Sequence, residues 1–282
     1  MDGVGRDVTG MSLSVLGRRR FDHSTRFLIS HRRLLLRVAR HELRARYAGS
    51  VLGVGWAVLT PLVMLCVYAS VYLVIFQVKV PGLSATQYVL LIFSGLVPFL
   101  ATSEALVAGV GAVVANKSVL SNTVFPIDLA PAKAVLLSQV TMVVGFLAIV
   151  VVLGATGGLS WTILLAPIIW GLHLLALLGL TWILSLVNLV FRDLQNGMGL
   201  ALMGLMIASP IAYTPEMVPP GLKMLIILNP FAYFVIAYQK LLVLGQLPPL
   251  WEILVLVTIS TGTFLVGGYF FSRAKLVLID YV

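Results

Sequence analysis

The chain has 282 residues, of which 60 % are hydrophobic and only 10 % are charged, and its mean hydropathy is +1.06. Apolar stretches of about twenty residues recur along it, and this is the length that a helix needs to cross a bilayer, so the composition excludes a water-soluble globular protein. The net charge of +9 does not indicate a nucleic-acid partner, because eleven of the nineteen Lys and Arg residues lie in the first 46 positions, just before the first apolar stretch.

The N-terminal part of the chain is polar and basic, so we expect no signal peptide and a cytoplasmic tail over residues 1–29. Residues 30–47 form a predicted helix on which basic side chains recur every three or four positions and share one stripe. Such an amphipathic basic helix is typical of the membrane interface, where arginines meet lipid head groups or a cytoplasmic partner. The simpler alternative is that these arginines only fix the orientation of the chain. The residues assigned to this role are Arg33, Arg37, Arg40, Arg44 and Arg46.

Six apolar stretches are long enough to span a membrane, and the turns between them are short. They cover residues 56–78, 86–113, 129–153, 161–190, 194–213 and 250–272. With six spans, sixteen of the nineteen basic residues fall on the side of the two termini, so the positive-inside rule places both termini in the cytoplasm. We therefore predict an all-α integral membrane domain over residues 30–282, with an N-terminal interface helix and six transmembrane helices.

The stretch 222–246 is also apolar, but it carries two lysines and is interrupted by Asn229 and Pro230. Proline removes a backbone donor and disfavours helix at the residue before it. We predict that this segment forms re-entrant exterior gate helices between the fifth and sixth spans, since broken helices at membrane depth need protein around them. The alternative is a surface loop with two interfacial helices.

Several kinds of chemistry are not expected from this sequence. It contains no G-x-x-x-x-G-K-[ST] loop for nucleotide phosphates, and no cluster of histidines and carboxylates at metal-ligand spacing. We predict no catalytic residue, no metal site and no cofactor in this chain. Of the charged residues and histidines, only Glu104 and His173 lie well inside the spans and away from their ends. Glu104 is interpreted as a polar group of a transport path or as a structural hydrogen-bonding residue, and His173 as structural.

Four motifs in order resemble one known family. They are "ARYAGSVLGVGWAVLTPL" at 45–62, "NKSVLSNTVFP" at 116–126, "FRDL" at 191–194, and "SPIAYTPEMVPP" with "LNPFAY" at 209–233. This pattern is similar to that of the ABC-2 type permeases of polysaccharide exporters, such as those for O-antigen and teichoic acid. The resemblance covers roughly residues 30–280 and leaves residues 1–29 outside.

The resemblance implies a homodimeric permease in a bacterial inner membrane, bound to a separate ABC ATPase subunit that holds ATP and magnesium. The transported substrate would be a lipid-diphosphate-linked polysaccharide of the O-antigen, teichoic-acid or galactan type. The stretch 114–127 is similar to the coupling helix of the family, and a second polar turn follows the fourth span. The residues assigned to ATPase coupling are Asn116, Lys117, Phe125, Arg192 and Asp193.

A glycan path across hydrocarbon needs flat apolar faces with polar rims, which aromatic side chains supply. Tyr68 and Tyr72 lie four residues apart in the first span, and Tyr213 and Tyr233 lie in the predicted gate. The alternative for these residues is helix packing and an interfacial aromatic belt. The full set assigned to the path is Tyr68, Tyr72, Phe76, Phe93, Phe99, Glu104, Tyr213 and Tyr233.

Two other classes of protein compete with this hypothesis. A secondary transporter or lipid-linked-sugar flippase without an ATPase partner would need more intramembrane charge or an internal repeat. A membrane-embedded glycosyltransferase would need acidic residues on an exterior loop, where only Glu216 and Glu252 lie.

Overall fold

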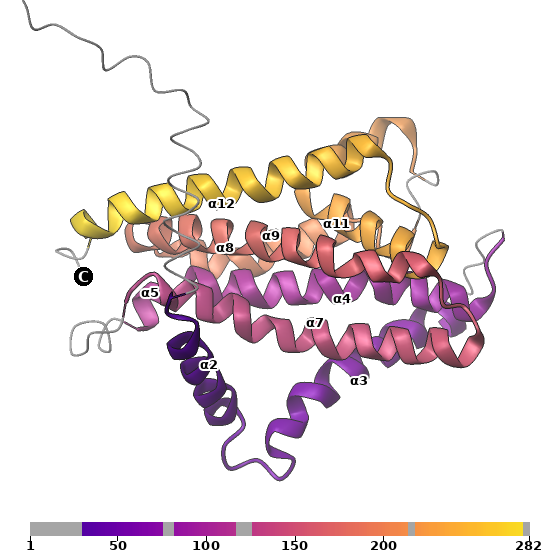
Figure 1. Ribbon diagram of the computed structural model, residues 1–282, viewed down its shortest axis with the longest axis horizontal. Coiled ribbons are helices and arrows are strands. Elements are labelled where there is room, and N and C mark those ends of the chain that lie inside the picture. Colours follow the sequence, from indigo (N-terminus) through magenta and orange to yellow (C-terminus); the bar gives the residue numbers. More distant parts are fainter. Residues whose placement is uncertain (1–29, 76–81, 117–125, 214–217, 279–282) are drawn as a thin grey trace, which may run out of the picture.

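The computed structural model describes residues 30–75, 82–116, 126–213 and 218–278, and the regular structure in these ranges is entirely helical (Figure 1). Five helices are long and apolar enough to cross a membrane, and a bent pair of shorter helices makes a sixth candidate. The predicted all-α membrane fold is confirmed. The principal helices are α2 (Arg32–Arg46), α3 (Trp56–Ser70), α4 (Ala85–Val110), α5 (Ala112–Ala115), α7 (Leu129–Thr156), α8 (Ala166–Val190), α9 (Asp193–Ala208), α10 (Lys223–Leu228), α11 (Pro230–Gln239) and α12 (Leu250–Leu278).

Local sequence signals set several helix ends. Ser84 and Gln87 form a reciprocal capping box at the start of α4, which satisfies backbone N–H groups that have no partner within the helix. Gly157 ends α7 with a φ of 71°, a left-handed conformation that costs glycine little. Asn229 caps α11, and Pro230 occupies its first turn, where a missing N–H is harmless.

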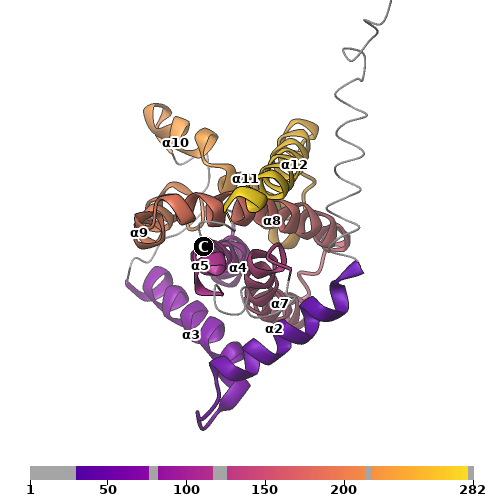
Figure 2. The same cartoon turned by 90° about the vertical axis from the view of Figure 1, so that its left-hand side faces the viewer.

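The helices form a bundle around α4 (Figures 1 and 2). In the apolar 18-residue stretch of α4, 72 % of the residues are buried, compared with 17 % in the corresponding stretch of the helix that contains α3. The end that carries α5 and the last turns of α12 is called the inner end below, and the opposite end, where α12 begins, is called the outer end. Helices α2 and α3 lie on one side of α4, and α10 and α12 lie on the other.

Close packing of α8 against α12 depends on two glycines. A Cβ atom on Gly179 would lie 2.2 Å from the Thr263 carbonyl oxygen, and one on Gly267 would lie 2.3 Å from the Gly179 carbonyl oxygen. Small residues let membrane helices approach until their backbones touch, which strengthens van der Waals packing where lipid offers no hydrophobic driving force. The two glycines therefore fix the crossing of α8 and α12.

The structure corrects the fifth predicted span. The stretch 194–213 was expected to be one helix, but α9 ends at Ala208 after 16 residues and is too short to meet the length required of a span. Ser209 is extended, with a ψ of 137°, because the following Pro210 disfavours helical geometry at the residue before it.

The other predicted elements correspond to helices with shifted ends. The helix expected over 30–47 is present as α2, and the sixth span, expected to end at 272, continues to Leu278. In the first predicted span, α3 continues as a π-helical turn over Val71–Ile75, and the remainder up to residue 78 lies outside the described residues.

Candidate functional site

Three groups of polar residues are candidates for a functional role. One lies at the inner end, one lies where α2 and α7 face α4, and one surrounds the bent pair of α10 and α11. At the inner end, Lys133 of α7 joins two segments. Its ammonium lies 2.5 Å from a carboxylate oxygen of Glu42 on α2 and donates to the Asn116 side-chain oxygen at 3.2 Å. Lys133 is only 7 % exposed, and a buried ammonium needs such partners. Asn116 also donates to the Ala112 carbonyl and so closes the end of α5.

The structure thus ties Asn116, a predicted coupling residue, to α2 through Lys133. Sequence reasoning treated Lys133 only as a topology signal and did not single out Glu42. The sequence did offer one signal for this contact, which is the position of Lys133 near the start of an apolar helix. A charge in such a place requires an acidic or polar partner. Arg192 and Asp193 are exposed, whereas Lys117 and Phe125 lie outside the described residues.

The predicted arginine stripe is present on α2. The side chains of Arg33, Arg37, Arg40 and Arg44 are exposed, and Ala39 on the opposite face is buried. These guanidinium groups are therefore available to lipid head groups or to a partner, as an interface helix requires.

Glu104, which was assigned to the path, lies on α4. Both of its carboxylate oxygens accept from the Thr141 hydroxyl of α7 at 2.9 Å, while the residue itself stays exposed. Arg46, at the end of α2, lies close enough to attract this carboxylate. The fold therefore brings Arg46 within electrostatic range of Glu104, which is 58 positions later in the sequence.

The structure describes only some of the aromatic residues that were assigned to the path. Tyr68 is half-buried and its hydroxyl lies 3.8 Å from the Met206 sulfur of α9. Phe93 packs against the core, and Phe99 is 2 % exposed within it, so the position of Phe99 favours packing. The side chain of Tyr72 and all of Phe76 lie outside the described residues.

His173 is 2 % exposed. Its ring stacks on Phe234 with centroids 4.5 Å apart, and its Nε2 atom lies 2.8 Å from the Thr102 hydroxyl. These contacts fit the structural role that was expected for it.

Helices α10 and α11 form the bent pair, with an angle of 96° between them at Asn229. Asn229 is 2 % exposed, and its amide donates to the Leu205 carbonyl and to the Ser209 hydroxyl. Phe231 belongs to a buried cluster with Leu202 of α9, so the bend lies inside the bundle. The predicted break at Asn229 and Pro230 is confirmed. Buried hydrogen bonds of Asn229 satisfy polar groups that have no partner within a helix at this break.

A short motif, Pro-x-Ala-Tyr, occurs on both sides of this bend and was not recognised as a repeat from the sequence. In each copy the tyrosine hydroxyl donates to a carbonyl six residues earlier: Tyr213 to Ile207 at 3.0 Å, and Tyr233 to Ile227 at 3.1 Å. Each of these carbonyls lies in the last turn of a helix, where it has no partner within the helix. The two predicted gate tyrosines therefore close the ends of α9 and α10.

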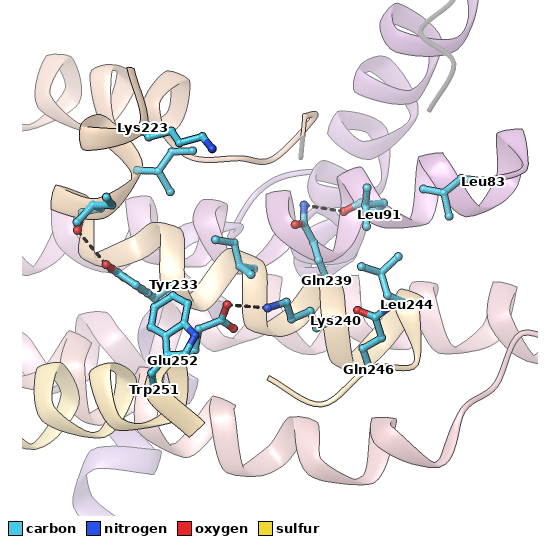
Figure 3. A pocket seen from close by; sticks show the side chains of 13 residues that line it. Leu83, Leu91, Lys223, Tyr233, Gln239, Lys240, Leu244, Gln246, Trp251 and Glu252 are labelled. Carbon is cyan, nitrogen blue, oxygen red and sulfur yellow. Dashed lines mark hydrogen bonds and ion pairs between the residues drawn. The ribbon is translucent and has the colours of Figure 1, made fainter. Parts of the chain in front are cut away.

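A cavity of about 600 Å³ lies between the bent pair, the start of α4 and the start of α12 (Figure 3). Lys240 and Glu252 form an ion pair in its wall at 2.6 Å. The rings of Tyr233 and Trp251 meet edge to face, with centroids 6.3 Å apart. Of the residues assigned to the path whose side chains the structure describes, only Tyr233 lines this cavity.

Within the described residues no group of three or more histidine, cysteine or acidic side chains is placed to hold a metal ion. The polar residues described above make hydrogen bonds and ion pairs between helices. This arrangement can bind and guide a ligand and can transmit movement between helices.

Comparison with known proteins identifies relatives of this chain. The sequence profile of the ABC-2 type transporter family matches residues 33–243. The O-antigen export system permease protein RfbA of Klebsiella pneumoniae is 28 % identical over 223 residues, which covers 76 % of this chain and 82 % of that protein. The protein of the same name from Myxococcus xanthus is 28 % identical over 239 residues, covering 83 % and 90 %. The polysialic acid transport protein KpsM of Escherichia coli is 26 % identical over 196 residues, covering 69 % and 75 %.

Proposed function

Because the chain belongs to the ABC-2 type transporter family, we propose that it is the membrane-spanning subunit of an ATP-driven exporter of a cell-surface polysaccharide. The observation that carries this proposal is the match to export permeases for O-antigen and polysialic acid over more than two thirds of the chain. A helical bundle with five to six candidate spans supplies the membrane domain that this function needs.

ATP hydrolysis belongs to a separate subunit in this proposal, since the sequence contains no phosphate-binding loop. The inner end is the docking side in this proposal, because α5 and Asn116 lie there and Asn116 belongs to the stretch that is similar to the coupling helix. The contacts of Lys133 with Glu42 and Asn116 support this assignment, since they link the docking segment to α2. Movement of the ATPase can then shift the interface helix.

The permease acts as a homodimer in this proposal, and α3 and α9 supply the contact surface. These helices are neighbours on one side of the bundle (Figure 2). Their outer faces carry exposed apolar side chains, among them Val63 and Val67 on α3 and Leu200, Met203 and Ile207 on α9. The glycan path runs between the two copies, bordered by Tyr68.

The substrate is a glycan on a lipid diphosphate carrier in a bacterial inner membrane, with both termini of the permease in the cytoplasm. Exposed arginines at the end of α2 can bind diphosphate oxygens in bidentate geometry. We assign this role to Arg44 and Arg46, which are both exposed at the end of α2.

The decisive experiment is reconstitution of the permease and its ATPase in proteoliposomes with a lipid-linked glycan. We expect ATP-dependent movement of the glycan, no ATP hydrolysis by the permease alone, and loss of movement when the ATPase is inactivated by mutation. Transport that continues without ATP and stops when ionophores collapse the ion gradients would instead identify a secondary transporter.

Two pairs of substitutions test the finer assignments in the same assay. Arg44→Ala with Arg46→Ala should weaken binding of the lipid diphosphate, and Tyr68→Ala with Tyr72→Ala should reduce glycan movement while basal ATP hydrolysis persists. Arg273→Ala is the control, because it removes one exposed charge at the inner end from α12 and not from the interface helix. Unchanged binding in the first pair would leave the arginines as topological anchors only.

A further inference from the structure

The cavity beside the bent pair has a composition that the proposed export path does not explain. Four segments form its walls: the start of α4, both helices of the bent pair, and the start of α12. Most of the lining is apolar. The apolar lining residues are Leu83, Leu91, Ile226, Ile227, Ile236 and Leu244. Its volume of about 600 Å³ falls in the range of small-molecule sites.

One polar atom in the wall of this cavity has no partner. Glu252 is 6 % exposed, and one carboxylate oxygen accepts from the Lys240 ammonium at 2.6 Å. The other oxygen, Oε2, is buried and makes no hydrogen bond within the part of the chain that the structure describes. A buried acceptor without a donor is costly, particularly on a charged group. The site therefore calls for a ligand that donates a hydrogen bond to this oxygen.

Positive charge borders the same space. Lys223 on α10 reaches it from the wall opposite the ion pair (Figure 3), and this residue is exposed. Together Lys223 and Lys240 bring two ammonium groups against one carboxylate, so the cavity carries a net positive charge. An anionic group between the two lysines would neutralise it.

The ligand must then combine an apolar body, an anionic group and a hydrogen-bond donor. A free sugar lacks the apolar body, and a plain fatty chain leaves Glu252 unsatisfied. A phospholipid with an amine or hydroxyl in its head group has all three features.

We propose that this cavity binds a membrane phospholipid at the outer end of the bundle. Its phosphate lies between Lys223 and Lys240, its head-group ammonium or hydroxyl donates to Glu252 Oε2, and its upper acyl carbons contact Ile226, Ile236 and Leu244. The lipid thereby fills the space between the bent pair and α12. This proposal does not depend on the transported substrate, and it can be tested on the permease alone.

Native mass spectrometry of the purified full chain, with added lipids of defined head group, provides the test. Phosphatidylethanolamine and phosphatidylglycerol carry a donor, whereas phosphatidylcholine has the same phosphate and chains but no N–H or O–H in its head group. We expect the first two lipids to bind about tenfold more tightly than phosphatidylcholine, since a hydrogen bond to a charged group is lost. Equal binding of the three lipids would overturn the proposal.

Variants locate the site. Glu252→Gln should remove most of the preference for phosphatidylethanolamine over phosphatidylcholine, and Lys223→Gln should weaken both lipids about threefold to tenfold. Lys223→Gln leaves the ion pair intact, so it keeps the test valid if Glu252→Gln does not fold. Arg273→Gln removes a charge from the inner end and should change nothing. Unaltered lipid binding in Lys223→Gln would contradict the assignment.

Two competing ligands distinguish a phospholipid from other molecules that carry a phosphate group. Inorganic phosphate at millimolar concentration should not displace the lipid, because it offers no apolar body. Polyprenyl phosphate should compete more weakly than phosphatidylethanolamine, because its phosphate carries no amine or alcohol for Glu252. Displacement by free phosphate would indicate an anion site, and tighter binding of polyprenyl phosphate would indicate a carrier-lipid site. Either result would overturn the phospholipid assignment.

Discussion

The ion pair between Glu42 and Lys133 should respond asymmetrically to removal of its two partners. The side chain of Lys133 is 9 % exposed, whereas that of Glu42 is 39 % exposed. Glu42→Gln leaves a buried ammonium that water cannot reach. Lys133→Met removes the buried charge itself and leaves a carboxylate that water can solvate. The two substitutions break the same ion pair but leave different charges without an oppositely charged partner.

The expected losses follow from these exposures. Breaking a buried ion pair by removing one partner costs about 3–5 kcal/mol. The hydrogen bond from Lys133 to Asn116 survives and offsets roughly 1–2 kcal/mol of that cost, so Glu42→Gln should lose about 2 kcal/mol. For Lys133→Met the remaining charge is partly exposed, and the loss should be about 1 kcal/mol or less.

Denaturation by SDS in mixed micelles, followed by circular dichroism, measures both free energies of unfolding. The double variant completes a cycle that isolates the coupling between the two residues. Arg40→Gln is the matched control on the exposed face of α2 and should stay within about 0.5 kcal/mol of the unmodified protein. Equal losses, or a larger loss for Lys133→Met, would refute the reasoning from burial.

Three further predictions rest on other parts of the structure. Gly179→Ala should lower the free energy of unfolding by about 1–3 kcal/mol, because its Cβ would meet the Thr263 carbonyl. Gly171→Ala, which meets no atom within 4 Å, should be neutral or stabilising in the same SDS titration. Asn229→Leu removes the hydrogen bonds that hold the bend and should cost about 1–3 kcal/mol by that titration, while Asn229→Ser keeps a cap and should cost less. In whole cells, an impermeant thiol reagent should label cysteines introduced at the outer end but not those of a second set, and labelling of the second set would reverse the assigned orientation. The outer set is Ser84, Gly158 and Gly221, and the set expected to stay unlabelled is Asp193 together with Ser118, which lies outside the described residues.

The sequence alone predicted the helical membrane fold and five of its candidate spans, whereas the predicted span 194–213 is the shorter helix α9 and the sixth candidate is the bent pair. In lipid every backbone polar group must be satisfied within its own segment, so an apolar stretch of sufficient length forms a helix whatever surrounds it. The break at Asn229 and Pro230 was predictable for the same local reason, because proline removes a donor and constrains its neighbour. The family also followed from the sequence, because its motifs lie in a fixed order along the chain.

The tertiary structure alone decided which side chains meet. The pairing of Lys133 with Glu42 and Asn116, the approach of Arg46 to Glu104, and the placing of Lys240 beside Glu252 all depend on how the helices are rotated and shifted against each other. Hydropathy leaves that rotation undetermined, because an apolar side chain is equally stable against lipid and against another helix. Close glycine contacts and buried hydrogen bonds select one arrangement, and these interactions form only when the helices are packed together.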